Sequence, residues 1–255
     1  MNPRTEPSSA VHGFHGPTSP SMQQAANILA SCIRNENTSR DQLEFIGTTC
    51  ARPYALVIVS CMTYRSKAET NDVLEFLKKT STSNVATYAN GQIIILTAYA
   101  DAQHIIDAIS KLEKQCKTTS VISLPFENMS TISQQYELAL YCLSRAGTYH
   151  VVDAKDWALP FIKKSITESL NLDGLTHPAL AKLAHYDELN QSNLLQTLKV
   201  YLEHDRNAQR CANMLYLHRN SLQYRVRRIQ EIADINLDDP EERTYLRLSF
   251  ILCGY

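Results

Sequence analysis

The fold is decided by residues 207–229, Asn207-Ala-Gln-Arg-Cys-Ala-Asn-Met-Leu-Tyr-Leu-His-Arg-Asn-Ser-Leu-Gln-Tyr-Arg-Val-Arg-Arg-Ile229. Apolar residues recur here at spacings of three and four. This pattern predicts two amphipathic helices, about Ala208 to Leu215 and Arg219 to Ala233, joined by a tight turn. The positions expected to face inward are Cys211, Ala212, Leu215, Leu222, Val226 and Ile229.

The outward face of the second helix is polar and basic. Six arginines and no acidic residue lie between Arg206 and Arg228. At 100° per residue, Asn220, Tyr224 and Arg227 lie opposite the apolar stripe. Asn and Gln can bond adenine edges, and Arg can bond guanine, in a bidentate manner. The pattern therefore indicates the recognition helix of a helix-turn-helix. An arginine-rich solvated helix that binds nothing is the alternative.

The predicted DNA-binding residues fall into three groups. Arg219, Asn220, Gln223, Tyr224 and Arg227 are expected to face bases or phosphates. Arg206, Arg210, Arg225 and Arg228 are expected to meet phosphates, which position the protein without reading sequence. Arg225 lies only about 60° from the apolar stripe, so it can instead point back into the domain. His218, at the expected N-cap, and Ser221, in the first turn, complete the set.

This stretch resembles the C-terminal helix-turn-helix of the PucR/CdaR-type transcription regulators, whose pattern is roughly T-A-x-x-L-x-V-H-x-N-T-L-x-Y-R-L-x-R-I. The matching residues are Cys211-Ala212, Leu215, Leu217-His218, Asn220-Ser221-Leu222, Tyr224-Arg225-Val226 and Arg228-Ile229. Cys211 and Ser221 stand where threonine is usual, and Val226 where leucine is usual. The resemblance covers roughly residues 175–252. It implies sequence-specific binding of double-stranded DNA and regulation of transcription.

Length and composition limit the remaining possibilities. The chain has 255 residues and a formal net charge of −1, so affinity for DNA must come from the local patch at 206–228. No apolar run reaches the ~18–20 residues of a membrane span, and no signal pattern opens the chain, so we expect a cytoplasmic protein. Its seven cysteines are scattered without a C-x-x-C pair. They are expected to be reduced core residues, with no metal site and no cofactor.

The N-terminal part alternates strand-like and helix-like segments. Residues 1–20 are expected to be a disordered tail, and two helices are predicted within 21–50. The apolar run 54–61 is typical of a central strand, and Asn90-Gly91 predicts a hairpin turn. The other predicted elements are a helix at 66–79, a helix capped by Asp101, a strand at 120–125, a helix at 131–145 and a strand at 150–152.

This β-α-β-β-α-β-α-β order resembles the degenerate GGDEF-like domain that precedes the helix-turn-helix in the same regulators. The expected fold is thus an α/β (α+β) GGDEF-like domain at 51–157, a linker at 158–174 and an all-α helix-turn-helix domain at 175–255. A cyclase needs carboxylates to hold Mg²⁺. The predicted turn Tyr88-Ala89-Asn90-Gly91-Gln92 has none. We therefore predict no catalytic residue and no enzymatic activity. The domain would serve as a scaffold, pair with another copy or retain a small-ligand pocket.

Two other functions compete with DNA binding. One is a nucleotide-binding or cyclase-like signalling protein acting through the GGDEF-like domain, which incubation with GTP and Mg²⁺ would reveal. The other is a module that uses its helices for protein contacts only, which a salt-dependent DNA shift would separate. We expect at least a homodimer, because symmetric pairs place two recognition helices on an inverted repeat. Some 50 residues precede the first strand, too few for a separate sensory domain of usual size. We therefore expect either that a small-molecule effector binds the GGDEF-like domain or that there is no effector.

Overall fold

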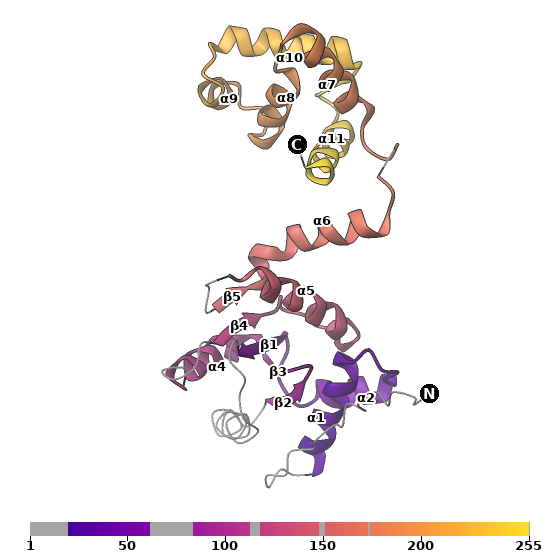
Figure 1. Ribbon diagram of the computed structural model, residues 1–255, viewed down its shortest axis with the longest axis vertical. Coiled ribbons are helices and arrows are strands. Elements are labelled where there is room, and N and C mark those ends of the chain that lie inside the picture. The colour runs from indigo at the N-terminus through magenta and orange to yellow at the C-terminus, as the bar shows by residue number, and fades with distance from the viewer. Residues whose placement is uncertain (1–19, 62–83, 113–117, 148–150, 173, 255) are drawn as a thin grey trace, which may run out of the picture. The chain divides into compact units, whose positions relative to one another are not determined.

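The computed structural model describes residues 20–61, 84–112, 118–147, 151–172 and 174–254. These residues form two compact units that divide between Leu159 and Pro160. The first unit contains a β-sheet covered by helices, and the second is helical (Figure 1). The helix predicted at 66–79 and the tail predicted at 1–20 lie almost wholly outside the described residues.

A mixed sheet forms the centre of the first unit. Its strands are β1 (Tyr54–Cys61), β2 (Val85–Ala89), β3 (Gln92–Ala98), β4 (Thr118–Ile122) and β5 (Val151–Asp153). They lie in the order β2-β3-β1-β4-β5; β1 is antiparallel to β3 and β4, and β4 is parallel to β5. Residues 54–59 of β1 are at most 1% exposed, which confirms the predicted central strand covered on both faces.

The hairpin between β2 and β3 forms at the predicted turn. Asn90 and Gly91 have φ of 52° and 78°, and Ala89 pairs with Gln92. A two-residue loop with positive φ twice is a type I′ turn, whose twist matches that of the flanking strands. The dipeptide therefore sets the register of the whole hairpin.

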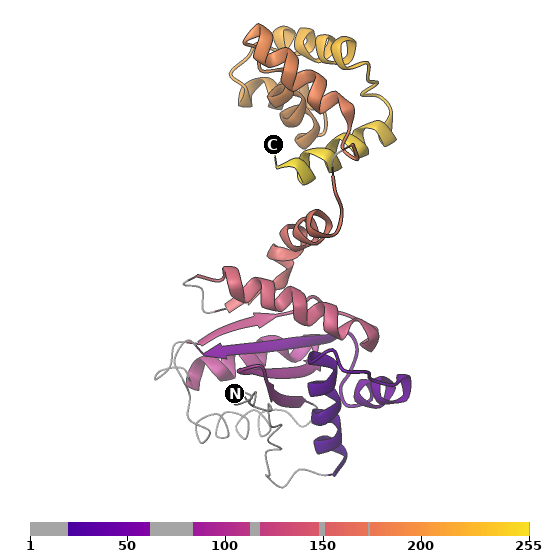
Figure 2. The same cartoon turned by 45° about the vertical axis from the view of Figure 1, so that its right-hand side comes forward.

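The helices around the sheet are α1 (Pro20–Ile33), α2 (Arg40–Gly47), α4 (Tyr99–Leu112) and α5 (Ile132–Arg145). Alternate residues of β1, including Val57 and Val59, pack with Ile105 and Ile106 of α4 in one apolar cluster. α5 contacts β1, β4 and α1, and Figure 2 shows it running along one face of the sheet. Both faces of the central strands are thereby removed from water, which explains why β1 and β3 are mostly apolar and buried rather than alternating.

Three sequence predictions in this unit need correction. β4 ends at Ile122 instead of continuing to residue 125, because the Ser123 hydroxyl accepts the Leu56 N–H that the strand ladder would otherwise use. α4 begins at Tyr99, so Asp101 lies in its first turn and is not its cap. β5 runs from 151 to 153 rather than from 150 to 152.

The second unit consists of α6 (Ala158–Ser169), whose first two residues fall in the first unit, α7 (Pro178–Asn190), α8 (Leu194–Glu203), α9 (Ala208–Met214), α10 (Arg219–Ala233) and α11 (Pro240–Cys253). α6 occupies most of the segment expected to be a linker and has no buried residue. The core lies between α7, α8, α10 and α11. Its largest members are Leu180, Leu183, Leu198, Leu202, Ile229, Leu246 and Phe250.

Side-chain caps define where the helices of this unit begin. His177 and Asp239 each accept a backbone N–H, and a proline follows each of them, where its missing N–H is harmless. α8 differs from the sequence expectation, which makes Ser192 the N-cap because serine precedes the helix. Ser192 does not cap it; Asp187 of α7 does, with bonds from the N–H groups of Leu194 and Leu195 at 2.8 and 2.9 Å. The cap comes from a neighbouring helix, so local sequence did not reveal it.

Candidate nucleic-acid interface

α9 and α10 form the predicted two-helix frame, and their apolar faces meet over α8. Cys211, Ala212, Leu222 and Ile229 are fully buried, which confirms the predicted inward face. The first three pack with Val200 of α8 in a single cluster. In Figure 1, α10 crosses α8. The buried side chains of α9, Cys211 and Ala212, are small, so α9 can approach its neighbouring helices closely.

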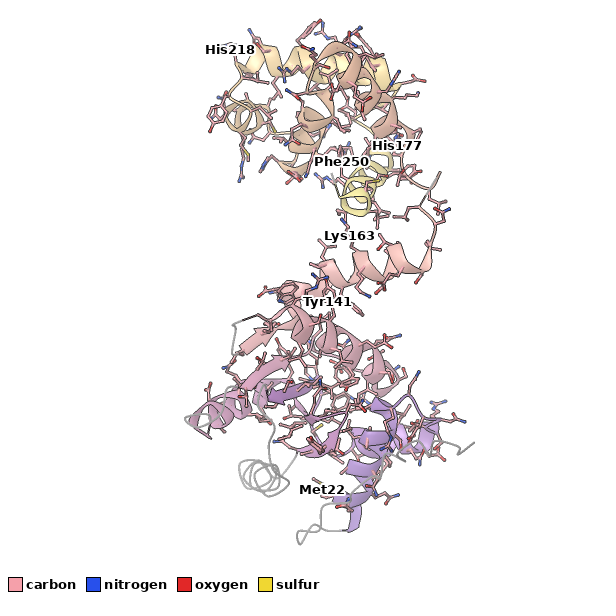
Figure 3. All side chains as sticks on the ribbon, viewed as in Figure 1. Met22, Tyr141, Lys163, His177, His218 and Phe250 are labelled. Carbon is pink, nitrogen blue, oxygen red and sulfur yellow. The ribbon has the colours of Figure 1, made fainter. Side chains whose placement is uncertain are left out.

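The turn between the two helices has a defined geometry. Tyr216 adopts φ +54°, and the N–H groups of Tyr216 and Leu217 donate to the carbonyls of Asn213 and Ala212 at 3.2 and 2.8 Å. This is a Schellman motif, which ends α9. His218 follows as the predicted N-cap of α10 and accepts the Asn220 N–H through Nδ1 at 3.3 Å (Figure 3). The start of α10 is therefore set by a cap that lies directly before it in the sequence.

The outward face of α10 is available for a ligand. Its exposed residues are Arg219, Asn220, Ser221, Gln223, Tyr224 and Arg227. Within the described part of the chain, the side chains of Arg219, Gln223 and Arg227 make no hydrogen bond or ion pair. Arg210 on α9 is likewise exposed and unpaired among the described residues. Their donors are thus free for base edges or phosphates.

The other three arginines have partners within the unit. Arg206 Nη1 donates to the Leu237 carbonyl at 3.1 Å and to Asp238 at 2.7 Å, joining the chain before α9 to the chain before α11. Arg225 Nη1 donates to the Thr197 hydroxyl at 3.3 Å, so this side chain turns back toward α8 as the wheel allowed. Arg228 lies over the ring of Tyr186, 5.8 Å from its centroid, and pairs with Glu231 at 3.1 Å.

Two exposed residues near the turn escaped the sequence reasoning. Tyr216 is 97% exposed and Met214 is 52% exposed, although both are bulky. The spacing rule marked them only as positions that do not face inward. A tyrosine directly after α9, where the left-handed conformation favours glycine, was the available signal.

The described residues hold no cluster of three His, Cys, Asp or Glu side chains able to bind a metal ion. Burial raises the pKa of the Cys211 thiol, so this cysteine beneath the basic patch is an inert core residue. The same cause raises the pKa of Cys50 and of Cys142 to about 11. No described helix is long and apolar enough to cross a membrane.

Comparison with known proteins agrees with this geometry. Residues 194–252 match the PucR C-terminal helix-turn-helix domain, so the chain carries that domain. It is 24% identical to the DNA-binding transcriptional activator AdeR of Bacillus subtilis over 88% of this chain and 57% of AdeR. It is 22% identical to the proline-responsive transcriptional activator PutR of the same organism over 90% of this chain and 62% of PutR. The chain thus spans about three fifths of the length of these relatives.

Two further similarities differ in extent. The purine catabolism regulatory protein of Bacillus subtilis is 41% identical over 70 residues, which is 28% of this chain and 13% of that protein. The crystal structure of a regulator of polyketide synthase expression from Bifidobacterium adolescentis covers 93% of this chain and 95% of its own. It has 14% identity and a TM-score of 0.46, too low to define the fold of the first unit.

Proposed function

We propose that the protein regulates transcription by binding a specific sequence of double-stranded DNA, with α10 in the major groove. One observation carries the proposal: α10 buries Leu222 and Ile229 completely while its opposite face presents unpaired polar and basic side chains. A helix with this division of faces, preceded by a second short helix at a tight turn, has the geometry of a recognition helix. The PucR-type domain at 194–252 supports the same role.

The residues divide by chemistry. Asn220 and Gln223 suit adenine edges, and Arg219 and Arg227 suit guanine edges. Tyr224 lies between them, and it contacts a base or a phosphate. Arg210 projects from α9 and meets the phosphate backbone, with Arg206, Arg225 and Arg228 adding positive charge behind the reading face. His218 and Ser221 hold the first turn of α10 against the groove.

We also propose that residues 51–157 form a degenerate GGDEF-like domain without catalytic activity. The strand order β2-β3-β1-β4-β5 and the β2–β3 hairpin support this assignment. The hairpin turn at 88–92 contains no carboxylate that could hold Mg²⁺. The domain acts as a scaffold and pairing surface, or as the site of an effector still to be identified. The whole protein works in the cytoplasm as at least a homodimer.

Selection of bound genomic DNA fragments tests the main proposal. Purified protein should enrich a small set of fragments that share an inverted repeat, and the band shifts should weaken steeply as salt rises. Arg219→Ala should lose the enrichment, whereas Lys163→Ala, outside the domain at 194–252, should keep it. Equal recovery of all fragments, or no DNA binding at low salt, would rule out sequence-specific regulation. Turnover of GTP in the presence of Mg²⁺ would instead assign the protein to nucleotide signalling.

A further inference from the structure

A cleft of about 490 Å³ opens beside α10, between that helix and the start of α8, with Tyr186 and Leu194 among its lining residues. Six lining residues carry the argument: Ser192, Asn220, Ser221, Tyr224, Arg225 and Arg228. They supply two guanidinium groups, three hydroxyls and one amide, and no carboxylate lines the cleft. A concave site with this set of donors suits an anion that has several oxygen acceptors.

Two acidic side chains that contact lining residues already have partners. The Asp187 carboxylate accepts bonds from the N–H groups of Leu194 and Leu195 and from the Ser192 hydroxyl, at 2.8, 2.9 and 2.5 Å. The negative charge of Asp187 therefore stabilises the first turn of α8. Glu231 pairs with Arg228 from the exposed side of α10. Neither carboxylate lines the cleft, whereas two guanidinium groups do.

Both guanidinium groups are held in place before any ligand arrives. Arg225 bonds the Thr197 hydroxyl, which is fully buried and itself donates to the Asn193 carbonyl at 2.7 Å. Arg228 is oriented by the ring of Tyr186. A hydrogen bond with Tyr186 also raises the pKa of Arg228, so this side chain stays charged. Each guanidinium has five N–H donors, and most remain free for a ligand. Fixed donors lose less entropy on binding than mobile ones.

We propose that this cleft binds one phosphodiester of the DNA backbone, at the edge of the half-site that α10 reads. The inference rests on the proposed function and extends its contacts beyond the two-helix motif to Ser192 in the α7–α8 loop. Asn220 and Tyr224 belong both to the cleft and to the outward face of α10. An anion in the cleft therefore lies next to the bases, where the backbone bordering the groove runs. A free phosphate-type effector has the same chemistry and is the other source to be tested.

Methylphosphonate scanning locates the contact, because each substitution removes the charge of one linkage. With wild-type protein on a selected duplex, one linkage per half-site should weaken binding about tenfold, as expected for a charge-assisted bond. Arg228→Gln should weaken binding to all sequences, lower the salt slope by about one, and lose the penalty at that linkage. Lys164→Gln is the matched control, since Lys164 also pairs with an acid one turn away on an exposed helix surface.

A second variant distinguishes the loss of a DNA contact from misfolding of the protein. Ser221 is exposed in the first turn of α10, where an acidic side chain favours the helix. Ser221→Asp should therefore leave thermal unfolding unchanged while it repels the phosphate and weakens binding more than tenfold. Specific binding that tolerates every methylphosphonate and the Ser221→Asp change would overturn the cleft but leave the proposed function standing. Absence of specific DNA binding by the wild type would remove both. Stabilisation by millimolar inorganic phosphate without a sensitive linkage would assign the cleft to a free anion and overturn the backbone contact.

Discussion

The carboxylate of Asp187 lies 2.8 Å from the backbone nitrogen of Leu194, although the two residues belong to successive helices. The same carboxylate accepts the Leu195 N–H and the Ser192 hydroxyl. One side chain of α7 thus satisfies the start of α8, a helix that otherwise has no side-chain cap from Asn193. α10 packs on both helices, so this contact also supports α10.

Removing the cap should destabilise the second unit. We expect Asp187→Ala to lower the free energy of unfolding by about 0.5–2 kcal/mol, as for other N-caps. Hydrogen exchange of peptides within 178–253 measures the effect on this unit alone. Glu188→Ala, a change at an exposed neighbouring acid, is the control and should be neutral. Equal protection in the two variants would mean that Asp187 is not the effective cap.

The core beneath α10 gives a larger expected effect. Leu222 is fully buried among Val200, Cys211 and Ala212. Leu222→Ala should therefore leave a cavity and cost about 2–5 kcal/mol in the free energy of unfolding. DNA binding should fall with it, because α10 loses its support. Unchanged exchange protection in α9 and α10 would show that this contact is not required for packing.

Base reading and phosphate contact can be told apart on α10 and α9. Arg227→Ala should weaken binding to the specific site by about 1–3 kcal/mol and relax the preference at one base pair. Arg210→Ala should weaken binding to all sequences alike and flatten the salt slope by about one unit. Titrations of specific and random duplexes at several salt concentrations make the comparison. An equal loss on both duplexes for Arg227→Ala would move that residue from base reading to the backbone.

The left-handed conformation of Tyr216 leads to a prediction of opposite sign. A bulky residue with φ +54° at the end of a helix pays a steric cost that glycine avoids. Because the side chain is 97% exposed, Tyr216→Gly loses little packing and should raise the free energy of unfolding by about 1 kcal/mol. Tyr216→Ala retains the strain and should not stabilise. If glycine and alanine gave the same stability, the turn would carry no measurable strain.

The sequence predicted local features well and tertiary partners poorly. α10 begins at Arg219 and ends at Ala233 as expected, because His218 caps it and apolar spacing marks its buried side. The Asn90-Gly91 turn formed for a similarly local reason. The partners of Arg225 and Arg228 were not predictable. Thr197 and Tyr186 come from other helices, and the helical wheel gives only a direction.

The lack of tertiary information also explains why the sequence predicted a linker where the structure has α6. The segment 158–169 has apolar residues at helical spacing but buries none of them, so no packing pattern distinguished it from a linker. The cap of α8 was assigned to Ser192 because serine precedes the helix in sequence. Asp187 takes that place because the fold brings its side chain on α7 beside the first turn of α8.

Assembly is the last prediction. One recognition helix covers only a few base pairs, so specificity calls for two helices on half-sites about 34–36 Å apart. Tyr245, Leu248 and Ile251 follow one another at spacings of three on α11, and all are 38–46% exposed, so they form an exposed apolar stripe. The Tyr245 hydroxyl donates to the Leu175 carbonyl, which leaves Leu248 and Ile251 as the centre of the proposed contact. We expect a homodimer by sedimentation at micromolar concentration, and footprints over two related half-sites. Leu248→Asp should yield monomers that bind the operator weakly, whereas Leu189→Asp, at a more exposed position on α7, should not. A monomeric mass for the wild type with and without DNA, together with protection of a single half-site, would exclude the dimer.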